Sequence, residues 1–214
     1  MCISVNMMLR KVRILMHCLC DGWIRSYTDH FFIGYSNSNQ KLITQFISDM
    51  KAVYNLKNYQ EWEHPVTNIE FASKKAFFDI LACIKSKEKD KARIPEEIMN
   101  GSLSIKIIAL RVFWDDEGSV GFYGKSRYLR AKCFSKKLKN QIIKLHESIG
   151  IKVIDDKSNK AIKISSRENI KKFADIINFS AGVKVCAKTK HPVWVGYEKR
   201  KVLKLLLRSY RYPL

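Results

Sequence analysis

The chain has 214 residues and a formal net charge of +20, from 40 Lys and Arg against 20 Asp and Glu. Its hydrophobic fraction of 46%, with only nine Gly and four Pro, excludes a disordered or fibrous protein. So large a positive charge favours a polyanionic partner, because cationic side chains release the counterions condensed on a phosphate backbone. The composition therefore predicts a folded protein that binds nucleic acid.

The first apolar stretch, residues 14–20, follows Arg10, Lys11 and Arg13 and has the outline of a signal peptide. The stretch is only seven residues long, far below the ~20 needed to span a bilayer, and no small-residue cleavage site follows it. We therefore expect no membrane partner and a cytoplasmic protein.

Six cysteines are scattered along the chain without a CxxC pair, which favours reduced thiols in the core over disulfides or a zinc site. His17 stands beside Cys18 and Cys20, but these spacings spread around a helix. We expect His17 to pack in the core.

One pattern occurs twice in the chain. The apolar segment ILMHCLCDG (14–22) ends in an acid and a glycine, as does LRVFWDDEG (110–118). Alternating residues then predict paired strands at 23–27, 31–36, 118–123, 128–133, 151–155 and 161–165. Apolar residues at helical spacing follow Ser38, Ser73, Ser135 and Ser166, which we expect to cap the helices that they precede.

Each half therefore reads helix, two strands, helix, two strands, helix, which predicts an α+β fold. We divide the chain into a first half (1–84), a charged linker (85–97), a second half (98–180) and a basic C-terminal extension (181–214). Pro95 is expected to start the helix that leads to the second acid.

An acid followed by Gly at the end of an apolar helix, duplicated in this order of elements, resembles the LAGLIDADG homing endonuclease family in its monomeric, two-repeat form. The segment FWDDEGSVGF matches the family motif closely, and CLCDGWI is assigned by its place in the repeat. The resemblance covers nearly the whole chain. It implies two pseudo-symmetric αββαββα halves that form an antiparallel β saddle around two central helices.

The resemblance also implies a metal site at Asp21, Gly22, Glu117 and Gly118. Hard carboxylate ligands from both central helices would hold Mg²⁺ or Mn²⁺ against the scissile phosphates. Asp21 and Glu117 are then the catalytic acids.

A basic residue that stabilises developing negative charge is assigned to Lys184 in the second half and to Lys87 or Lys91 in the first. Asp115 and Asp116 point elsewhere around their helix and are interpreted as surface or capping groups.

The sequence departs from the family pattern in two places. Larger residues stand where the family has small ones at the contact between the central helices, namely Met16, Cys20, Val112 and Asp116. The polar position at the end of the second strand is taken by Ser36 and Cys133. These departures favour weaker catalysis.

The densest basic stretch, GFYGKSRYLRAKCFSKKLKN (121–140), has seven Lys or Arg and no acid. Alternation along a strand places Arg130 and Lys132 on one face, which can enter the major groove of DNA. Lys125 and Arg127, at the turn, are expected to meet phosphates. The full set of expected DNA-binding residues is Arg25, Tyr27, Lys125, Arg127, Arg130, Lys132 and Lys136, with His30 and Tyr35 on the corresponding strands of the first half.

The C-terminal extension reads as a loop followed by a basic helix. We expect the helix to dock on the second half through Val202, Leu205, Leu206 and Tyr210. Auxiliary phosphate contacts are expected from its basic residues, namely Lys188, Lys190, Lys199, Arg200, Lys201, Lys204 and Arg208.

The predicted function is that of a site-specific homing endonuclease that hydrolyses double-stranded DNA, encoded in an intron or intein. The alternative is a family member that does not cleave and serves as a DNA-binding regulator or as an intron RNA maturase. The presence of both acids favours the enzyme, and the large residues between the central helices favour the alternative.

Overall fold

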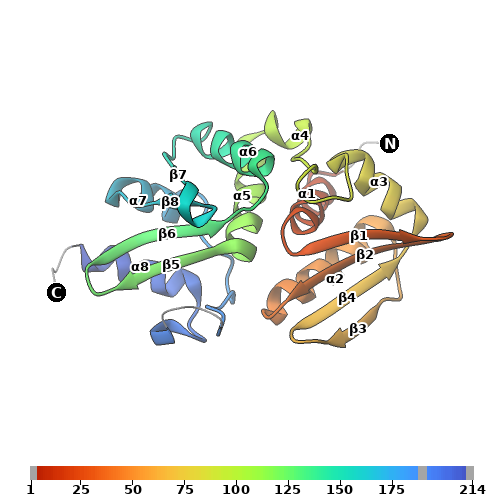
Figure 1. Cartoon of the computed structure of the whole chain (residues 1–214), viewed down its shortest axis with the longest axis horizontal. Helices are drawn as coiled ribbons and strands as arrows, with labels where there is room; N and C mark the ends of the chain where they lie inside the picture. Colours follow the sequence, from red (N-terminus) through yellow and green to blue (C-terminus); the bar gives the residue numbers. More distant parts are fainter. Residues whose placement is uncertain (1–3, 188–191, 211–214) are drawn as a thin grey trace.

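The structure, a computed structural model, describes residues 4–187 and 192–210. Both halves follow the order helix, two strands, helix, two strands, helix (Figure 1). The first half consists of α1 (Val5–Leu19), β1 (Gly22–Tyr27), β2 (His30–Asn37), α2 (Gln40–Tyr54), β3 (Gln60–Glu63), β4 (Thr67–Ala72) and α3 (Lys74–Ile84). The second half consists of α5 (Leu103–Glu117), β5 (Gly118–Tyr123), β6 (Ser126–Lys132), α6 (Lys136–Glu147), β7 (Ile154–Asp156), η1 (Lys157–Asn159), β8 (Ala161–Ile164) and α7 (Arg167–Ile176). The short helix α4 (Glu96–Met99) precedes the second half, and η2 (Pro192–Trp194) and α8 (Lys199–Ser209) follow it.

Each half folds its strands into one antiparallel sheet. The first sheet has the strand order β1-β2-β4-β3, and the second has the equivalent order β5-β6-β8-β7. The predicted α+β fold with two αββαββα halves is confirmed.

Helices α1 and α5 lie side by side at the centre of the molecule, with one sheet on either side of the pair (Figure 1). Each of these helices leads directly into the first strand of its sheet, at Gly22 and Gly118. A Cβ at Gly22 would lie 2.8 Å from the Cα of Cys18, and one at Gly118 would lie 2.4 Å from the carbonyl oxygen of Trp114. Only glycine fits these helix-to-strand junctions, and the preceding acids are held at the bases of the two sheets.

Serine hydroxyls begin several helices, as predicted. Ser73, Ser135 and Ser166 each accept a hydrogen bond from the backbone N–H three residues later. The prediction for Ser38 was wrong, because β2 stays paired with β4 as far as Asn37 and the N-cap of α2 is Asn39.

The prediction for Pro95 was also wrong. Pro95 caps the separate helix α4, which ends at Met99, and α5 begins only at Leu103. The break falls at Gly101, where a Cβ would lie 2.6 Å from the carbonyl oxygen of Glu97.

Cys18, Cys20 and Cys133 are buried thiols, which confirms the core role predicted for them. Within residues 4–187 and 192–210, no helix combines the length and apolarity that a bilayer crossing requires.

Candidate active site

Asp21 and Glu117 lie together at the C-terminal ends of the two central helices. Asp21 follows Cys20, the C-cap of α1, and Glu117 is the last residue of α5. Burial, and next the charge of Asp116, raise the pKa of Asp21 to about 6. Burial, and next the charge of Asp21, raise the pKa of Glu117 to about 8. The two carboxyl groups therefore repel each other in a partly desolvated site.

Asp116 is not a surface group, which corrects the sequence interpretation. Its side chain is 0% exposed between the two halves. One carboxylate oxygen accepts a 2.6 Å hydrogen bond from the hydroxyl of Tyr35, and the other lies 2.9 Å from Nδ1 of His17. His17 is buried as predicted, and its polar partner comes from the opposite half.

Asp115 is likewise buried rather than exposed. Its carboxylate accepts the backbone N–H of Ser180 at 3.0 Å, and burial raises its pKa to about 6. Successive residues of a helix point in different directions, so Asp115 faces Ser180 while Asp116 faces His17 and Tyr35.

Asn37, not Ser36, supplies the polar side chain at the end of β2. Its Nδ2 donates to Oδ2 of Asp21 at 3.1 Å. A shift of one residue along a strand turns the side chain to the other face of the sheet. The equivalent position in the second half is Cys133, as expected, and it provides only a thiol.

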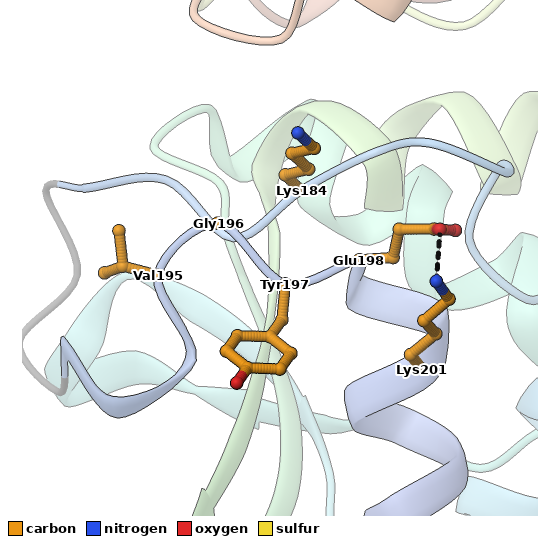
Figure 2. A pocket seen from close by; sticks show the side chains of 6 residues that line it. All are labelled: Lys184, Val195, Gly196, Tyr197, Glu198 and Lys201. Carbon is orange, nitrogen blue, oxygen red and sulfur yellow. Dashed lines mark ion pairs between the residues drawn. The ribbon is translucent and has the colours of Figure 1, made fainter.

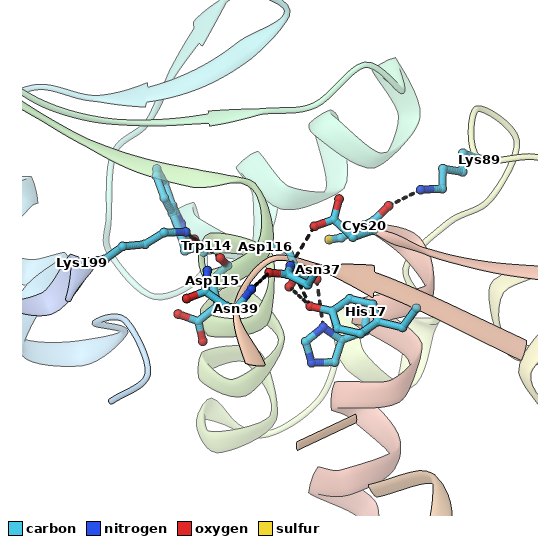
Figure 3. Close-up of polar contacts among 11 residues, drawn as sticks. His17, Cys20, Asn37, Asn39, Lys89, Trp114, Asp115, Asp116 and Lys199 are labelled. Carbon is cyan, nitrogen blue, oxygen red and sulfur yellow. Dashed lines mark hydrogen bonds and ion pairs between the residues drawn. The ribbon is translucent and has the colours of Figure 1, made fainter. Parts of the chain in front are cut away.

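The lysines that act on the acids differ from those predicted. The charges that lower the pKa values of both Asp21 and Glu117 belong to Lys89 and Lys199. Lys89 donates through Nζ to the backbone carbonyl of Cys20, at the end of α1. Lys199, at the start of α8, is 6% exposed and donates at 2.6 Å to the backbone carbonyl of Asp115. In Figure 3 the two lysines approach from opposite sides of Asp116.

The three lysines named from the sequence make other contacts. Lys87 donates to the hydroxyl of Ser26 at 3.0 Å, and Lys91 pairs with Glu88. Lys184 is exposed and lines a pocket of about 430 Å³ with Tyr197, Glu198 and Lys201 (Figure 2). Lys89 lies between Lys87 and Lys91, so the sequence pointed to the correct segment but not to the correct lysine. Nothing in the local sequence distinguishes Lys199 from the other lysines of its helix.

The two acids fit a divalent cation by their chemistry. They are hard oxygen ligands, they repel each other, and burial penalises their charged forms. In the part of the chain that the structure describes, no group of three or more His, Cys, Asp or Glu side chains is arranged to hold a metal. A metal at this pair would therefore need ligands from elsewhere, such as phosphate oxygens of a bound nucleic acid.

The face of the second sheet that points away from the helices is basic, and we call it the basic face. It carries Arg130, Lys132 and Lys163 on neighbouring strands. Lys132 is exposed, whereas Arg130 forms a 3.2 Å ion pair with Asp156 and lies over the ring of Tyr128. Lys125, in the β5–β6 turn, and Lys136, at the start of α6, are also exposed.

Arg127 lies on the opposite face of the second sheet, contrary to the prediction of a phosphate contact. It alternates with Arg130, so it points inward with Leu129. Its Nε donates to the hydroxyl of Ser209 at 2.5 Å, and its guanidinium lies over the ring of Phe122. Arg127 therefore fastens α8 to the sheet.

The corresponding face of the first sheet is aromatic rather than basic. Arg25 forms two hydrogen bonds with Glu70, at 2.7 and 2.8 Å, and lies over the ring of Phe32. Tyr27 is 78% exposed, as a DNA contact requires, whereas Tyr35 is fully buried on the other face. As expected, the second sheet carries more positive charge on this face than the first sheet does.

Helix α8 docks against β5 and α7, as predicted (Figure 1). Val202 and Leu206 are buried, but Leu205 is 38% exposed, and Leu203 takes its place in the contact. Lys188 and Lys190, expected to contact phosphates, lie outside the described residues.

Comparison with protein-family models finds no match, and no curated protein matches the sequence. Solved structures do match the fold. The crystal structure of I-DmoI in complex with DNA and Mn superposes with a TM-score of 0.60 and 16% identity, over 80% of this chain and 97% of that one. The homing endonuclease I-WcaI bound to its DNA recognition sequence gives 0.57 and 14%, over 82% and 84%. Full-length DUF199/WhiA from Thermatoga maritima gives 0.60 and 11%, over 98% and 63%. The chain thus has the two-repeat fold of these proteins.

Proposed function

We propose that the chain is a metal-dependent homing endonuclease of the LAGLIDADG type that binds double-stranded DNA and hydrolyses its phosphodiester bonds. The observation that carries this proposal is the meeting of Asp21 and Glu117 at the ends of two paired helices, one from each half of the repeat. Two similar folds, those of I-DmoI and I-WcaI, belong to proteins solved with DNA, in the case of I-DmoI together with Mn or with Ca.

Asp21 and Glu117 would hold Mg²⁺ or Mn²⁺, together with the backbone at Gly22 and Gly118. The ion, when bound, supplies the positive charge that activates water and stabilises the leaving oxygen. The chain's own residues orient and balance the acids: Asn37 donates to Asp21, and Lys89 and Lys199 add positive charge on either side.

Duplex DNA would lie across the two sheets. Lys132 and Lys163 of the basic face would provide most of the phosphate contacts, together with Lys125 in the β5–β6 turn and Lys136 at the start of α6. Tyr27 and Arg25 would contact the other half of the site. Because one chain carries both acids and both sheets, we propose that it acts as a monomer, and sedimentation should find one chain per particle.

The test is selection of cleaved sites from a random duplex library in Mg²⁺, followed by assays of Asp21→Asn and Glu117→Gln on the best site. Each substitution removes an anionic ligand with little change of shape, so binding should persist while nicking is lost. Variants that still cut would show that the active site lies elsewhere.

A second candidate is a DNA-binding regulator or RNA maturase without nuclease activity. It is favoured by the buried polar contact of His17 with Asp116, which stands between helices where the family is expected to have small residues. A wild-type protein that binds one duplex or one intron RNA specifically and never cuts DNA would select this function.

A further inference from the structure

A continuous chain of hydrogen bonds runs from the contact between the halves to Asp21. His17 and Tyr35 contact the two carboxylate oxygens of Asp116, at 2.9 and 2.6 Å. Asn37 Nδ2 then lies 3.0 Å from the hydroxyl of Tyr35 and 3.1 Å from Oδ2 of Asp21. Figure 3 shows His17, Asn37 and Asp116 close together where the two central helices end.

The direction of each bond is fixed by the donors available. The carboxylate of Asp116 only accepts, so the single hydroxyl proton of Tyr35 goes to it, and the oxygen of Tyr35 must accept from Asn37. The Asn37 amide cannot be reversed, because its Oδ1 accepts the backbone N–H of Asn39 at 2.8 Å. Both protons of its NH₂ group are thereby directed at Tyr35 and Asp21.

The chain of bonds is also rigid. Tyr35 is 0% exposed, its ring stacks on Phe46 with centroids 5.0 Å apart, and the ring of His17 lies 4.6 Å away. Asn37 is 8% exposed. Packing therefore holds these side chains in one arrangement before any ligand binds.

Among the residues that the structure describes, the second half has no equivalent set of hydrogen bonds. Gly22 pairs with Tyr35 in the first sheet and Gly118 pairs with Ala131 in the second, so Ala131 takes the place of Tyr35 and Cys133 that of Asn37. Cys133 donates to the backbone carbonyl of Ser135 at 3.6 Å instead of reaching an acid.

We propose that Tyr35 and Asn37 are positioning residues for Asp21, that Asp116 holds them in place from the opposite half, and that Glu117 lacks such support. The inference rests on the proposed function, since it makes the two acids unequal partners in cutting the two DNA strands. Asp21 is oriented in advance, whereas Glu117 depends on DNA and metal for its orientation.

The test is Tyr35→Phe, which removes the bridging hydroxyl and keeps the stacked ring. Tyr54→Phe is the matched control, because the hydroxyl of Tyr54 donates to Asp79 at 2.7 Å in a part of the protein that does not contact Asp21. The first measurement is the ¹⁵N–¹H signal of the Asn37 side-chain amide in metal-free protein. It should move in Tyr35→Phe and stay in place in Tyr54→Phe.

The second measurement is the rate of nicking of each strand of the selected duplex. Tyr35→Phe should slow one strand by about tenfold or more, because a small misplacement of a reacting group is costly. The other strand and the DNA affinity should change less than about twofold. A signal of Asn37 that does not move, or equal slowing of both strands, would overturn the inference.

A wild-type protein that cuts nothing would refute the proposed function alone. The Asn37 signal would still decide whether Asp116 and Tyr35 organise Asp21.

Discussion

The indole N–H of Trp114 donates to Nε2 of His146 at 2.8 Å, and both rings are fully buried. Nδ1 of His146 donates in turn to the backbone carbonyl of Ile142 at 2.7 Å. The ring is therefore neutral, because a proton on Nε2 would point at the indole N–H.

This contact predicts a pH-dependent loss of stability. Burial lowers the pKa of His146 to about 4 from its usual 6.5, so the unfolded chain takes up a proton before the folded chain does. The contribution of neutral His146 to the free energy of unfolding is fully present above pH 6.5. About 3 kcal/mol of it is lost as the pH falls towards 4. Denaturant unfolding of wild type and His146→Gln measures it, because the other groups titrate alike in both proteins. A difference between the two that stays constant from pH 7 to pH 4 would contradict this assignment.

Glu117→Gln should make the metal-free protein more stable at alkaline pH. The pKa of Glu117 is raised to about 8 in the folded state, so its destabilising effect grows as the pH rises from about 4.5 to 8. The variant should gain on the order of 4 kcal/mol over wild type by pH 8 and very little at pH 4.5. Thermal unfolding in a chelator measures this gain, with Glu147→Gln on the exposed side of α6 as control. An equal gain at both pH values would show that Glu117 is not buried beside Asp21.

Lys132→Ala and Arg127→Ala should separate DNA binding from folding. Lys132 lies on the basic face, so its loss should weaken duplex binding and reduce the slope of log K against log salt by roughly 0.9 if it contacts one phosphate. Arg127 holds α8, so its loss should lower the melting temperature and leave affinity nearly unchanged. Fluorescence anisotropy at several salt concentrations and a melting curve distinguish them. If Arg127→Ala weakens DNA binding without lowering the melting temperature, Arg127 contacts a phosphate, as expected from the sequence.

Gly118→Ala should destabilise the protein by about 2–3 kcal/mol through overpacking. The new methyl group would lie 2.4 Å from the carbonyl oxygen of Trp114 and 2.6 Å from its indole ring, and neither group has room to move. Ser119→Ala, one residue further and exposed, should change little. Chemical denaturation compares the two variants, and equal midpoints would mean that the junction has room for a side chain.

Local patterns predicted most of the fold. Serine caps, apolar spacing and alternation located six of the strands and most of the helices, because each signal lies within a few consecutive residues. Ser36 was assigned one residue too early, because pairing with a distant strand decides which face a residue occupies. Arg127 was assigned to the turn, but β6 begins at Ser126, so Arg127 lies within the strand and alternates with Arg130.

The acids of the candidate site could also be predicted, since their positions repeat. The residues that support them could not. Asp116 meets Tyr35 and His17, which are 81 and 99 positions away in the sequence, and Lys199 reaches the site only because α8 folds back onto the second half. A pattern within one segment of the sequence does not predict a hydrogen bond between two distant segments.

The pairing of His17 with Asp116 means that the two halves cannot be exchanged. Where α5 has Asp116, α1 has Cys20, and where α1 has His17, α5 has Phe113. A symmetric dimer built from two copies of the first half would face each buried histidine with a thiol in place of a carboxylate. Recombining halves from different proteins of this fold would therefore require His17, Tyr35 and Asp116 to be transferred together.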